Sequence, residues 1–245
     1  MTNENGGDPI QVHGLDLVAS RRRDSPLLLS DAHFTVRAAT MTAVIGRSGI
    51  GKSTLVRCLA GAVAPARGSV LVAGSQLWPR PRRRRSRQAG HESVGLMFQS
   101  ANLVSSLSVR NNVALPSRLR PDPDWRVRTT EALATVGLAA HASRRPAELS
   151  GGEQQRVAIA RLIASGPAVA LIDEPTSSLD ASTAEQITDA LVQLAQRGTA
   201  VFVVTHDLDL ASRADRTLVF TGGGLRDHTG DRVGALRRSL DTTAC

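Results

Sequence analysis

The sequence predicts an α/β fold with a mainly parallel sheet, an antiparallel β part near the N-terminus and an inserted helical region. Short apolar runs rich in β-branched residues alternate with helix-like stretches along most of the 245 residues. Such alternation is typical of strand–helix–strand units joined by right-handed crossovers. A glycine-rich loop joins one of these strands to the helix behind it. The expected division of the single domain is a core at about 8–99 and 151–225, a helical subdomain at about 100–150 and a tail at 226–245.

The composition limits the class of protein. A chain of this length suits one domain, or a core with an inserted subdomain. Hydrophobic residues make up 41% of the sequence, but aromatic residues only 2%, and there is no Tyr. The core must therefore be built from Leu, Val, Ile and Ala. The two cysteines, Cys58 and Cys245, form neither a disulfide framework nor a metal-ligand spacing, which fits a reducing cytoplasm.

No secretion signal or membrane span is expected, and the charge is basic. The first residues are polar, unlike a signal peptide, and no run of about 18 uncharged apolar residues occurs. The net charge is +8, part of it from the Arg80–Arg87 run. Such a block of like charges is usually solvated, but it also suits contact with anionic lipid or another polyanion. Trp78 is the one aromatic residue near the run, so nucleic acid is not expected as a partner.

Each secondary-structure element follows from a local pattern. Apolar, β-branched or alternating runs predict the following strands: 10–18, 27–36, 41–45, 69–74, 94–99, 169–174, 200–207 and 217–220. Helix-like runs predict the following helices: 55–60, 109–115, 126–136, the part of 149–164 behind its glycine loop, 183–197 and 208–214. Pro116 is expected to close the first helix of the inserted region, and the tail from Gly222 is expected to be loose.

Residues 46–54 fit the phosphate-binding pattern G-x-x-x-x-G-K-[ST], between an expected strand and an expected helix. Glycines let successive backbone N–H groups point at phosphate oxygens, and the helix adds its positive N-terminal end. Lys52 would bring a full charge to the β- and γ-phosphates, and the Ser53 hydroxyl would ligate Mg²⁺. The alternative, a chance glycine-rich turn, does not account for the full pattern in this context. The expected nucleotide contacts are Gly46, Arg47, Ser48, Gly49, Ile50, Gly51, Lys52, Ser53 and Thr54.

Polar residues follow the expected parallel strands at their carboxyl ends, where functional groups of such sheets collect. Asp173 suits Mg²⁺ binding, and Glu174 can polarise a water for attack on the γ-phosphate; the alternative is a solvated pair of acids. We expect His206 to sense the γ-phosphate, although a lone His after a strand is more often a structural hydrogen-bonding residue. Gln99 can reach Mg²⁺ or the attacking water through its amide.

A second glycine loop precedes a second helix at residues 149–153. By the same physics it forms another anion site, with Ser150, Gly151 and Gly152 at the helix N-terminus. One ATP needs only one P-loop, so the second site requires an explanation. A symmetric dimer supplies it, because each chain's second loop can cover the nucleotide held by the P-loop of the other.

With these motifs the chain resembles the nucleotide-binding subunits of ATP-binding cassette (ABC) transporters. Residues 149–156, LSGGEQQR, are similar to that family's signature. The resemblance covers nearly the whole chain: it identifies Gln99 with the Q-loop, 169–173 with Walker B, Ser178-Leu179-Asp180 with the D-loop and His206 with the switch. It implies a P-loop NTPase core, ATP and Mg²⁺ as cofactors, and Asp180 near the nucleotide. It also implies two partners, a second copy in a head-to-tail dimer and an integral membrane permease.

Two segments indicate a subgroup of the family, and two positions depart from the family's usual pattern. Residues 98–103 and 111–116 are similar to the lipoprotein-releasing and macrolide-export type, whose permease typically has few transmembrane helices and a large external domain. The aromatic residue that usually stacks on adenine is missing near Ala19, so adenine stacking is either absent or supplied by another group, such as a guanidinium from Arg21–Arg23. Ala39 stands where a glycine is common in the turn before the P-loop strand.

One other class of function shares these motifs. A soluble ABC ATPase acting on nucleic acid or ribosomes usually fuses two cassettes or inserts long coiled coils, and this sequence has neither. A non-hydrolysing, ATP-gated scaffold is disfavoured by Glu174 and His206. We therefore expect ATP hydrolysis coupled to transport by a permease of the export type, at the inner face of the plasma membrane.

Overall fold

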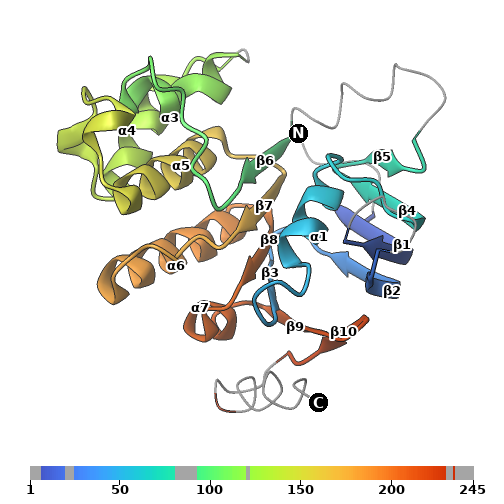
Figure 1. Cartoon of the computed structure of the whole chain (residues 1–245). Coiled ribbons are helices and arrows are strands. Elements are labelled where there is room, and N and C mark those ends of the chain that lie inside the picture. Colours follow the sequence, from blue (N-terminus) through green and yellow to red (C-terminus); the bar gives the residue numbers. More distant parts are fainter. Residues whose placement is uncertain (1–6, 20–24, 81–92, 120–121, 230–233, 235–245) are drawn as a thin grey trace.

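The computed structural model describes residues 7–19, 25–80, 93–119, 122–229 and 234, and it contains two sheets joined by helices (Figure 1). The larger sheet has the strand order β10-β9-β3-β8-β7-β6. Its strands are β3 (Met41–Ile45), β6 (Val94–Met97), β7 (Val169–Asp173), β8 (Ala200–Thr205), β9 (Arg216–Thr221) and β10 (Gly224–Asp227). All neighbouring pairs are parallel except β9 with β10. The expected mainly parallel sheet is confirmed.

The central strands are buried on both faces. Every residue of β3, β7 and β8 is buried, as parallel strands are when other layers cover both sides of the sheet. Alternate side chains enter different apolar clusters, so that Ala43 and Ile45 belong to one cluster and Val44 to the other. The helices α1 (Lys52–Leu59), α5 (Gly151–Ser165), α6 (Ala181–Gln196) and α7 (Leu208–Ser212) contribute to these clusters, as do the helices of the inserted region described below. Helix α1 lies between the two sheets (Figure 1).

The smaller sheet is antiparallel, with the order β2-β1-β4-β5. Its strands are β1 (Ile10–Val18), β2 (Leu27–Val36), β4 (Arg67–Val72) and β5 (Ser75–Trp78). The antiparallel part therefore combines the N-terminal strands with two strands that follow the P-loop helix. Strand β5 was not predicted, because it has only four residues and polar Gln76 interrupts its apolar pattern.

The inserted region contains α3 (Val109–Arg118), α4 (Trp125–Thr135) and two short 3₁₀ turns at Ala139–His141 and Pro146–Glu148. Helices α3 and α4 pack against α5 (Figure 1). The expectation that Pro116 closes α3 was wrong, since the helix continues through it to Arg118. Packing against α5 accounts for this extension, because the Ser117 hydroxyl donates to the Ala164 carbonyl of α5 at 3.3 Å.

The segment after β9 also differs from its prediction. The expected loose tail from Gly222 instead turns at Gly223, with φ +90°, and returns as β10 along β9. The sequence did not indicate this strand, because its four residues are half-buried or exposed and include two charges.

Among the described residues, no helix is both long and apolar enough to span a bilayer.

Candidate functional site

The P-loop follows β3 and runs into α1. Gly49 and Gly51 have φ +80° and +117°, and Gly51 is the N-cap of α1. A Cβ on Gly51 would lie 2.9 Å from Cδ1 of Leu28, so both the backbone angle and the space require glycine here. Lys52, the first residue of α1, donates from Nζ to the carbonyl oxygens of Gly46 at 2.7 Å and Arg47 at 3.2 Å. The ammonium group is thus held over the loop that would bind phosphate.

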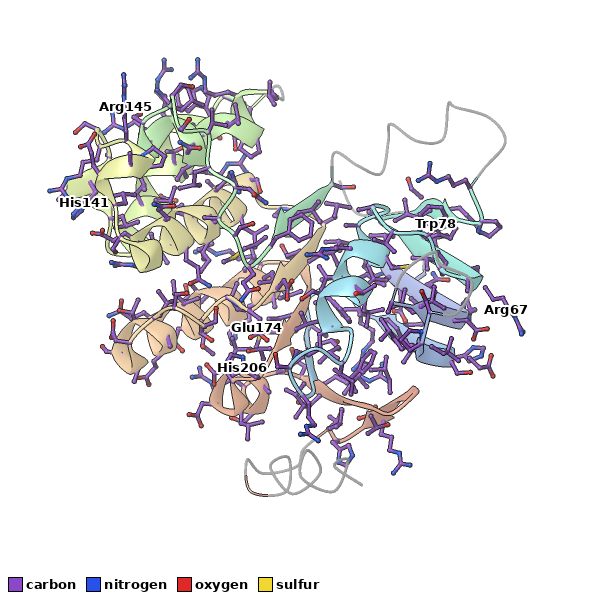
Figure 2. The ribbon with its side chains drawn as sticks, in the orientation of Figure 1. Arg67, Trp78, His141, Arg145, Glu174 and His206 are labelled. Atoms are coloured by element: carbon purple, nitrogen blue, oxygen red, sulfur yellow. The ribbon has the colours of Figure 1, made fainter. Side chains whose placement is uncertain are left out.

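The carboxyl ends of three parallel strands meet at this loop. Gln99, Glu174 and His206 follow β6, β7 and β8 and line one cavity of about 260 Å³ with the P-loop. Glu174 and His206 lie together near the centre of Figure 2. The lining residues are Ser48, Gly49, Gly51, Lys52, Ser53, Thr54, Gln99, Glu174 and His206. Segments far apart in the chain therefore face the same space, as expected from the strand ends.

Glu174 lies at the centre of a polar network. Its Oε2 is 2.8 Å from Nδ1 of His206 and accepts hydrogen bonds from the Thr205 hydroxyl and the His206 backbone N–H, both at 3.3 Å. Its Oε1 is 3.7 Å from Nζ of Lys52. Its backbone has φ +52°, and the backbone N–H donates to the Val204 carbonyl at 2.9 Å. The carboxylate thus faces the cavity beside a cation and an imidazole.

Asp173, one residue earlier, has a different environment. It is 2% exposed, and its Oδ1 has no hydrogen-bond partner among the described residues. Burial raises the pKa of Asp173, the nearby Glu174 charge raises it further, and a hydrogen bond with Ser53 opposes both effects. Ser53 also lines the cavity. A buried carboxylate oxygen without a partner, beside a hydroxyl, is a donor set that suits a hard cation such as Mg²⁺.

No group of three or more His, Cys, Asp or Glu side chains in the described part of the chain is arranged to hold a metal ion. This arrangement is compatible with Mg²⁺, which usually takes one or two protein ligands and completes its shell with water and substrate phosphates.

The second glycine loop lies outside the cavity of its own chain. Ser150 caps α5 by accepting from the Glu153 N–H at 3.3 Å, and Oε2 of Glu153 accepts from the Ser150 N–H at 2.7 Å. Hydrogen bonds from the backbone and side chain of Ser150 to the Glu153 carboxylate lower the pKa of Glu153. A Cβ on Gly151 would meet no atom of the described residues within 4 Å, whereas one on Gly152 would lie 3.0 Å from the Ser178 carbonyl oxygen. This exposed loop is thus packed against the D-loop, away from the P-loop of the same chain.

Asp180 does not line the cavity either. Its carboxylate caps α6, accepting from the Thr183 N–H at 3.0 Å and from the Thr183 hydroxyl at 2.8 Å. These hydrogen bonds lower the pKa of Asp180. The cavity of the single chain brings together six of the nine predicted P-loop residues with Gln99, Glu174 and His206. Its lining does not include Gly46, Arg47, Ile50, Asp173 or the predicted contacts of the signature and D-loop.

Three polar residues near Glu174 were missed by sequence reasoning. Thr205 bonds the Glu174 carboxylate, as described above. The Thr176 hydroxyl donates to Oδ2 of Asp207 at 2.9 Å and ties the segment after β7 to the segment after β8. Gln155 of α5 donates from Nε2 to the Glu174 backbone carbonyl at 2.7 Å. The apolar neighbours of Thr205 and the signature motif around Gln155 were the available signals.

The two departures from the family's usual pattern, at Ala39 and near Ala19, can be compared with the structure. Ala39 adopts φ +58°, so the turn keeps the left-handed conformation that glycine favours despite its Cβ. The backbone N–H of Ala19 donates to the Pro26 carbonyl at 3.1 Å, but Arg21–Arg23 lie outside the described residues. Of the Arg80–Arg87 run, only Arg80 is described, with its guanidinium 4.5 Å from the ring centre of Trp78.

The chain is similar to proteins of one family. The family model described as "ABC transporter" matches residues 29–177, more than half of the chain. The methionine import ATP-binding protein MetN of Caulobacter vibrioides is 42% identical over 205 residues, and the match covers 80% of this chain but 59% of that protein. The lipoprotein-releasing system ATP-binding protein LolD of Bordetella pertussis is 38% identical over 230 residues, covering 92% of this chain and 99% of that protein.

Solved structures give the same result. A dimeric structure of MJ0796, described as a bacterial ABC transporter cassette, is 28% identical with a TM-score of 0.81, covering 91% of this chain and 99% of that one. A second dimeric structure of MJ0796, in a post-hydrolysis state bound to ADP and Pi, has a TM-score of 0.80. These matches show that the chain belongs to the ABC transporter family and has the fold of its ATP-binding, ATP-hydrolysing cassette.

Proposed function

We propose that the chain binds Mg·ATP at the cavity described above and hydrolyses it to drive a separate membrane permease. The observation that carries this proposal is the meeting of the P-loop with Gln99, Glu174 and His206 in one cavity. The backbone N–H groups of the P-loop and Lys52 bind the phosphates. Ser53, Asp173 and Gln99 hold Mg²⁺, which shields charge on the β- and γ-phosphates when bound.

Glu174 acts on the attacking water in this mechanism. Its carboxylate polarises the water and accepts its proton. The water oxygen bonds to the γ-phosphorus while the bond from that phosphorus to the β-phosphate oxygen breaks, so that ADP and phosphate are formed. His206 contacts the γ-phosphate and registers its presence. Because His206 is also 2.8 Å from the Glu174 carboxylate, loss of the phosphate changes the surroundings of both side chains together.

A second copy of the chain completes the site. Ser150 and Gly151 are exposed at the N-terminal end of α5, where backbone N–H groups attract an anion. In a head-to-tail dimer they, with Gly152 and Asp180, cover the ATP held by the other chain. ATP then closes the dimer and hydrolysis reopens it, which is a two-state change biased by γ-phosphate contacts. The dimeric MJ0796 structures support this arrangement.

The helical subdomain, at about 100–150, relays this motion to the permease and keeps the chain at the inner face of the membrane. The remaining chain is the core at about 8–99 and 151–225, with a tail from 226. Export-type transport is supported by the two segments around Gln99 and Asn112. Asn112 is buried; its Oδ1 accepts from the Val104 N–H at 2.7 Å and its Nδ2 donates to the Val104 carbonyl at 3.0 Å, so it joins the segment after the Q-loop to α3.

The permease can be tested by purification. When the affinity-tagged chain is expressed in its native host, an integral membrane protein is expected to co-purify with it from detergent-solubilised membranes. The ATPase activity of the purified sample should be unaffected by ribonuclease treatment. Recovery of RNA or ribosomes in place of a membrane protein would favour the rival function, an ABC ATPase acting on nucleic acid.

Glu174→Gln tests the hydrolytic role, because it keeps the side-chain shape but removes the charge that polarises water. We expect unchanged ATP affinity by calorimetry, turnover lower by about a hundredfold or more, and a persistent ATP-bound dimer in size-exclusion chromatography with light scattering. Glu185→Gln, at an exposed acid of α6, is the matched control and should behave like wild type. Wild-type turnover by Glu174→Gln would contradict the proposed mechanism.

A further inference from the structure

The backbone of Glu174 is held from three directions. Its N–H is bonded to β8 through the Val204 carbonyl, at 2.9 Å. Its carbonyl oxygen accepts two hydrogen bonds, from Nε2 of Gln155 at 2.7 Å and from the Ser177 hydroxyl at 3.2 Å. Gln155 is the only one of these partners that comes from α5 rather than from the strand ends and the loop after β7. Helix α5, the signature helix, therefore forms a hydrogen bond with the backbone of the residue that carries the water-activating carboxylate.

The conformation of Glu174 explains why such a tie is useful. Its φ of +52° lies in the left-handed region, which a residue with a Cβ adopts only when its surroundings hold it there. The direction of the carboxylate depends on this backbone angle. A donor aimed at the carbonyl oxygen favours the angle that keeps the carboxylate beside Lys52 and His206.

Gln155 is not placed for stability alone. The residue is 3% exposed, and its Oε1 is buried without a hydrogen-bond partner among the described residues. A buried polar atom without a partner is unfavourable, so an apolar side chain of the same length would pack as well. What such a side chain would lose is the donor to Glu174.

We propose that Gln155 is a positioning residue that sets the backbone angle of Glu174 and so couples the signature helix to the water-activating carboxylate of the same chain. Ser150 begins that helix, where it would meet the nucleotide of the partner, and Gln155 lies about one and a half turns further along. Movement of α5 when the dimer closes thereby reaches Glu174 directly. The inference rests on the proposed hydrolytic role of Glu174.

Gln155→Met and Gln155→Glu test the proposal in the full chain. Met keeps the side-chain length without a donor, and Glu replaces the donor with an acceptor that faces the carbonyl oxygen. We expect kcat to fall by about tenfold to a hundredfold in Gln155→Met and further in Gln155→Glu, with the KM for ATP within about twofold of wild type. The melting temperature of Gln155→Met should stay close to that of wild type.

Thr199→Val is the matched control. It removes another buried side-chain hydrogen bond to a backbone carbonyl, that of Pro167 at 2.7 Å, at the opposite end of β7 and β8 from Glu174. This variant should melt at a lower temperature with kcat unchanged. If Gln155→Met keeps wild-type kcat, or if Thr199→Val loses as much kcat as Gln155→Met, the positioning role is wrong.

The double variant Glu174→Gln/Gln155→Met distinguishes action through Glu174 from a general effect on the signature loop. With the carboxylate already removed, Gln155→Met should cause no further loss of turnover and should leave the ATP-bound dimer intact. Loss of that dimer would overturn the proposal, because Gln155 would then act on dimer closure itself. Failure of the proposed function appears separately, as wild-type turnover in Glu174→Gln alone.

Discussion

At the scale of single residues, two adjacent carboxylates have different surroundings. Asp173 is buried and has one oxygen without a partner in the described part of the chain, whereas Glu174 is bonded by Thr205 and His206 at the cavity wall. Side chains that share a chemistry can take different roles when their environments differ. This difference in burial supports the proposed division, with a cation at Asp173 and water at Glu174.

The buried charge of Asp173 predicts a pH-dependent change in stability. The pKa of Asp173 is raised in the folded chain, so folding favours the protonated carboxyl. The contribution of Asp173 to stability is therefore fully present below the unfolded pKa and is lost as the pH rises through the folded pKa. Without Mg²⁺ or nucleotide at neutral pH, Asp173→Asn should therefore melt a few degrees above wild type. The difference should shrink as the pH approaches about 3.9, the unfolded value.

Differential scanning fluorimetry in a chelator across this pH range measures the effect. Adding Mg·ATP should reverse the order, because the ligand stabilises the protein that binds it better. A lower melting temperature for Asp173→Asn in the chelator at neutral pH would show that the charge is not a stability penalty.

At the scale of elements, α5 connects the segments that form the site. It begins at Ser150, contacts the residue after β7 through Gln155, and contacts the segment after β6 through Arg161. The Arg161 guanidinium donates to the carbonyl oxygens of Ala101 and Asn102, both at 3.0 Å. One helix therefore holds the two segments that follow β6 and β7, which contain Gln99 and Glu174.

The junction of β1 and β4 offers a test of backbone geometry. Gly68 has φ +94°, and a Cβ there would lie 2.4 Å from the Gly14 carbonyl oxygen. Gly74 has a similar φ of +75° but open space around it. Alanine is strained at both positions, but only Gly68→Ala also forces backbone apart.

We expect Gly68→Ala to melt at least about 2–4 °C below Gly74→Ala, because overpacking adds about 1 kcal/mol or more to the shared strain. Calorimetry on both variants checks this order. Equal melting temperatures would show that the sheet relaxes around the new methyl group.

The sequence predicts the central elements well and the edges poorly. Strands β3, β7 and β8 are continuous apolar runs because both of their faces are covered. Such runs identify buried strands in the sequence. Strands β5 and β10 have four residues each and carry polar side chains, so no local signal separates them from turns. At the site, the sequence predicts the residues with roles in the motifs, but it does not show that Gln155, within the signature, donates to the backbone of Glu174.

At the scale of the whole molecule, the structure contains half of the proposed site. The exposed signature loop and the cavity lie on different parts of the chain, and the proposed head-to-tail dimer would bring them together. This geometry can be tested by mixing two inactive variants. Lys52→Ala removes the phosphate-binding charge, and Gly151→Asp places a carboxylate where the partner's phosphate would lie.

Gly151→Asp should fold, because a Cβ at Gly151 meets no atom within 4 Å and an acid is favourable in the first turn of a helix. Each variant alone should have little ATPase activity. In a mixed dimer, the P-loop of the Gly151→Asp chain faces the signature of the Lys52→Ala chain, so one intact site forms. Random mixing should restore up to about a quarter of wild-type activity. No recovery on mixing would contradict a head-to-tail dimer.

The scarcity of aromatic residues has a consequence for observing this motion. The chain has two Trp and no Tyr. Trp78 is 6% exposed, and its indole N–H donates to the Cys58 carbonyl of α1 at 3.2 Å. Trp125 begins α4, with guanidinium groups of Arg118 and Arg126 centred 5.4 and 4.6 Å from its ring. The intrinsic fluorescence of the unlabelled protein thus comes from one emitter beside the P-loop helix and one in the helical region. A soluble quencher such as acrylamide reaches the second emitter more easily, so the two parts can be followed separately as nucleotide binds.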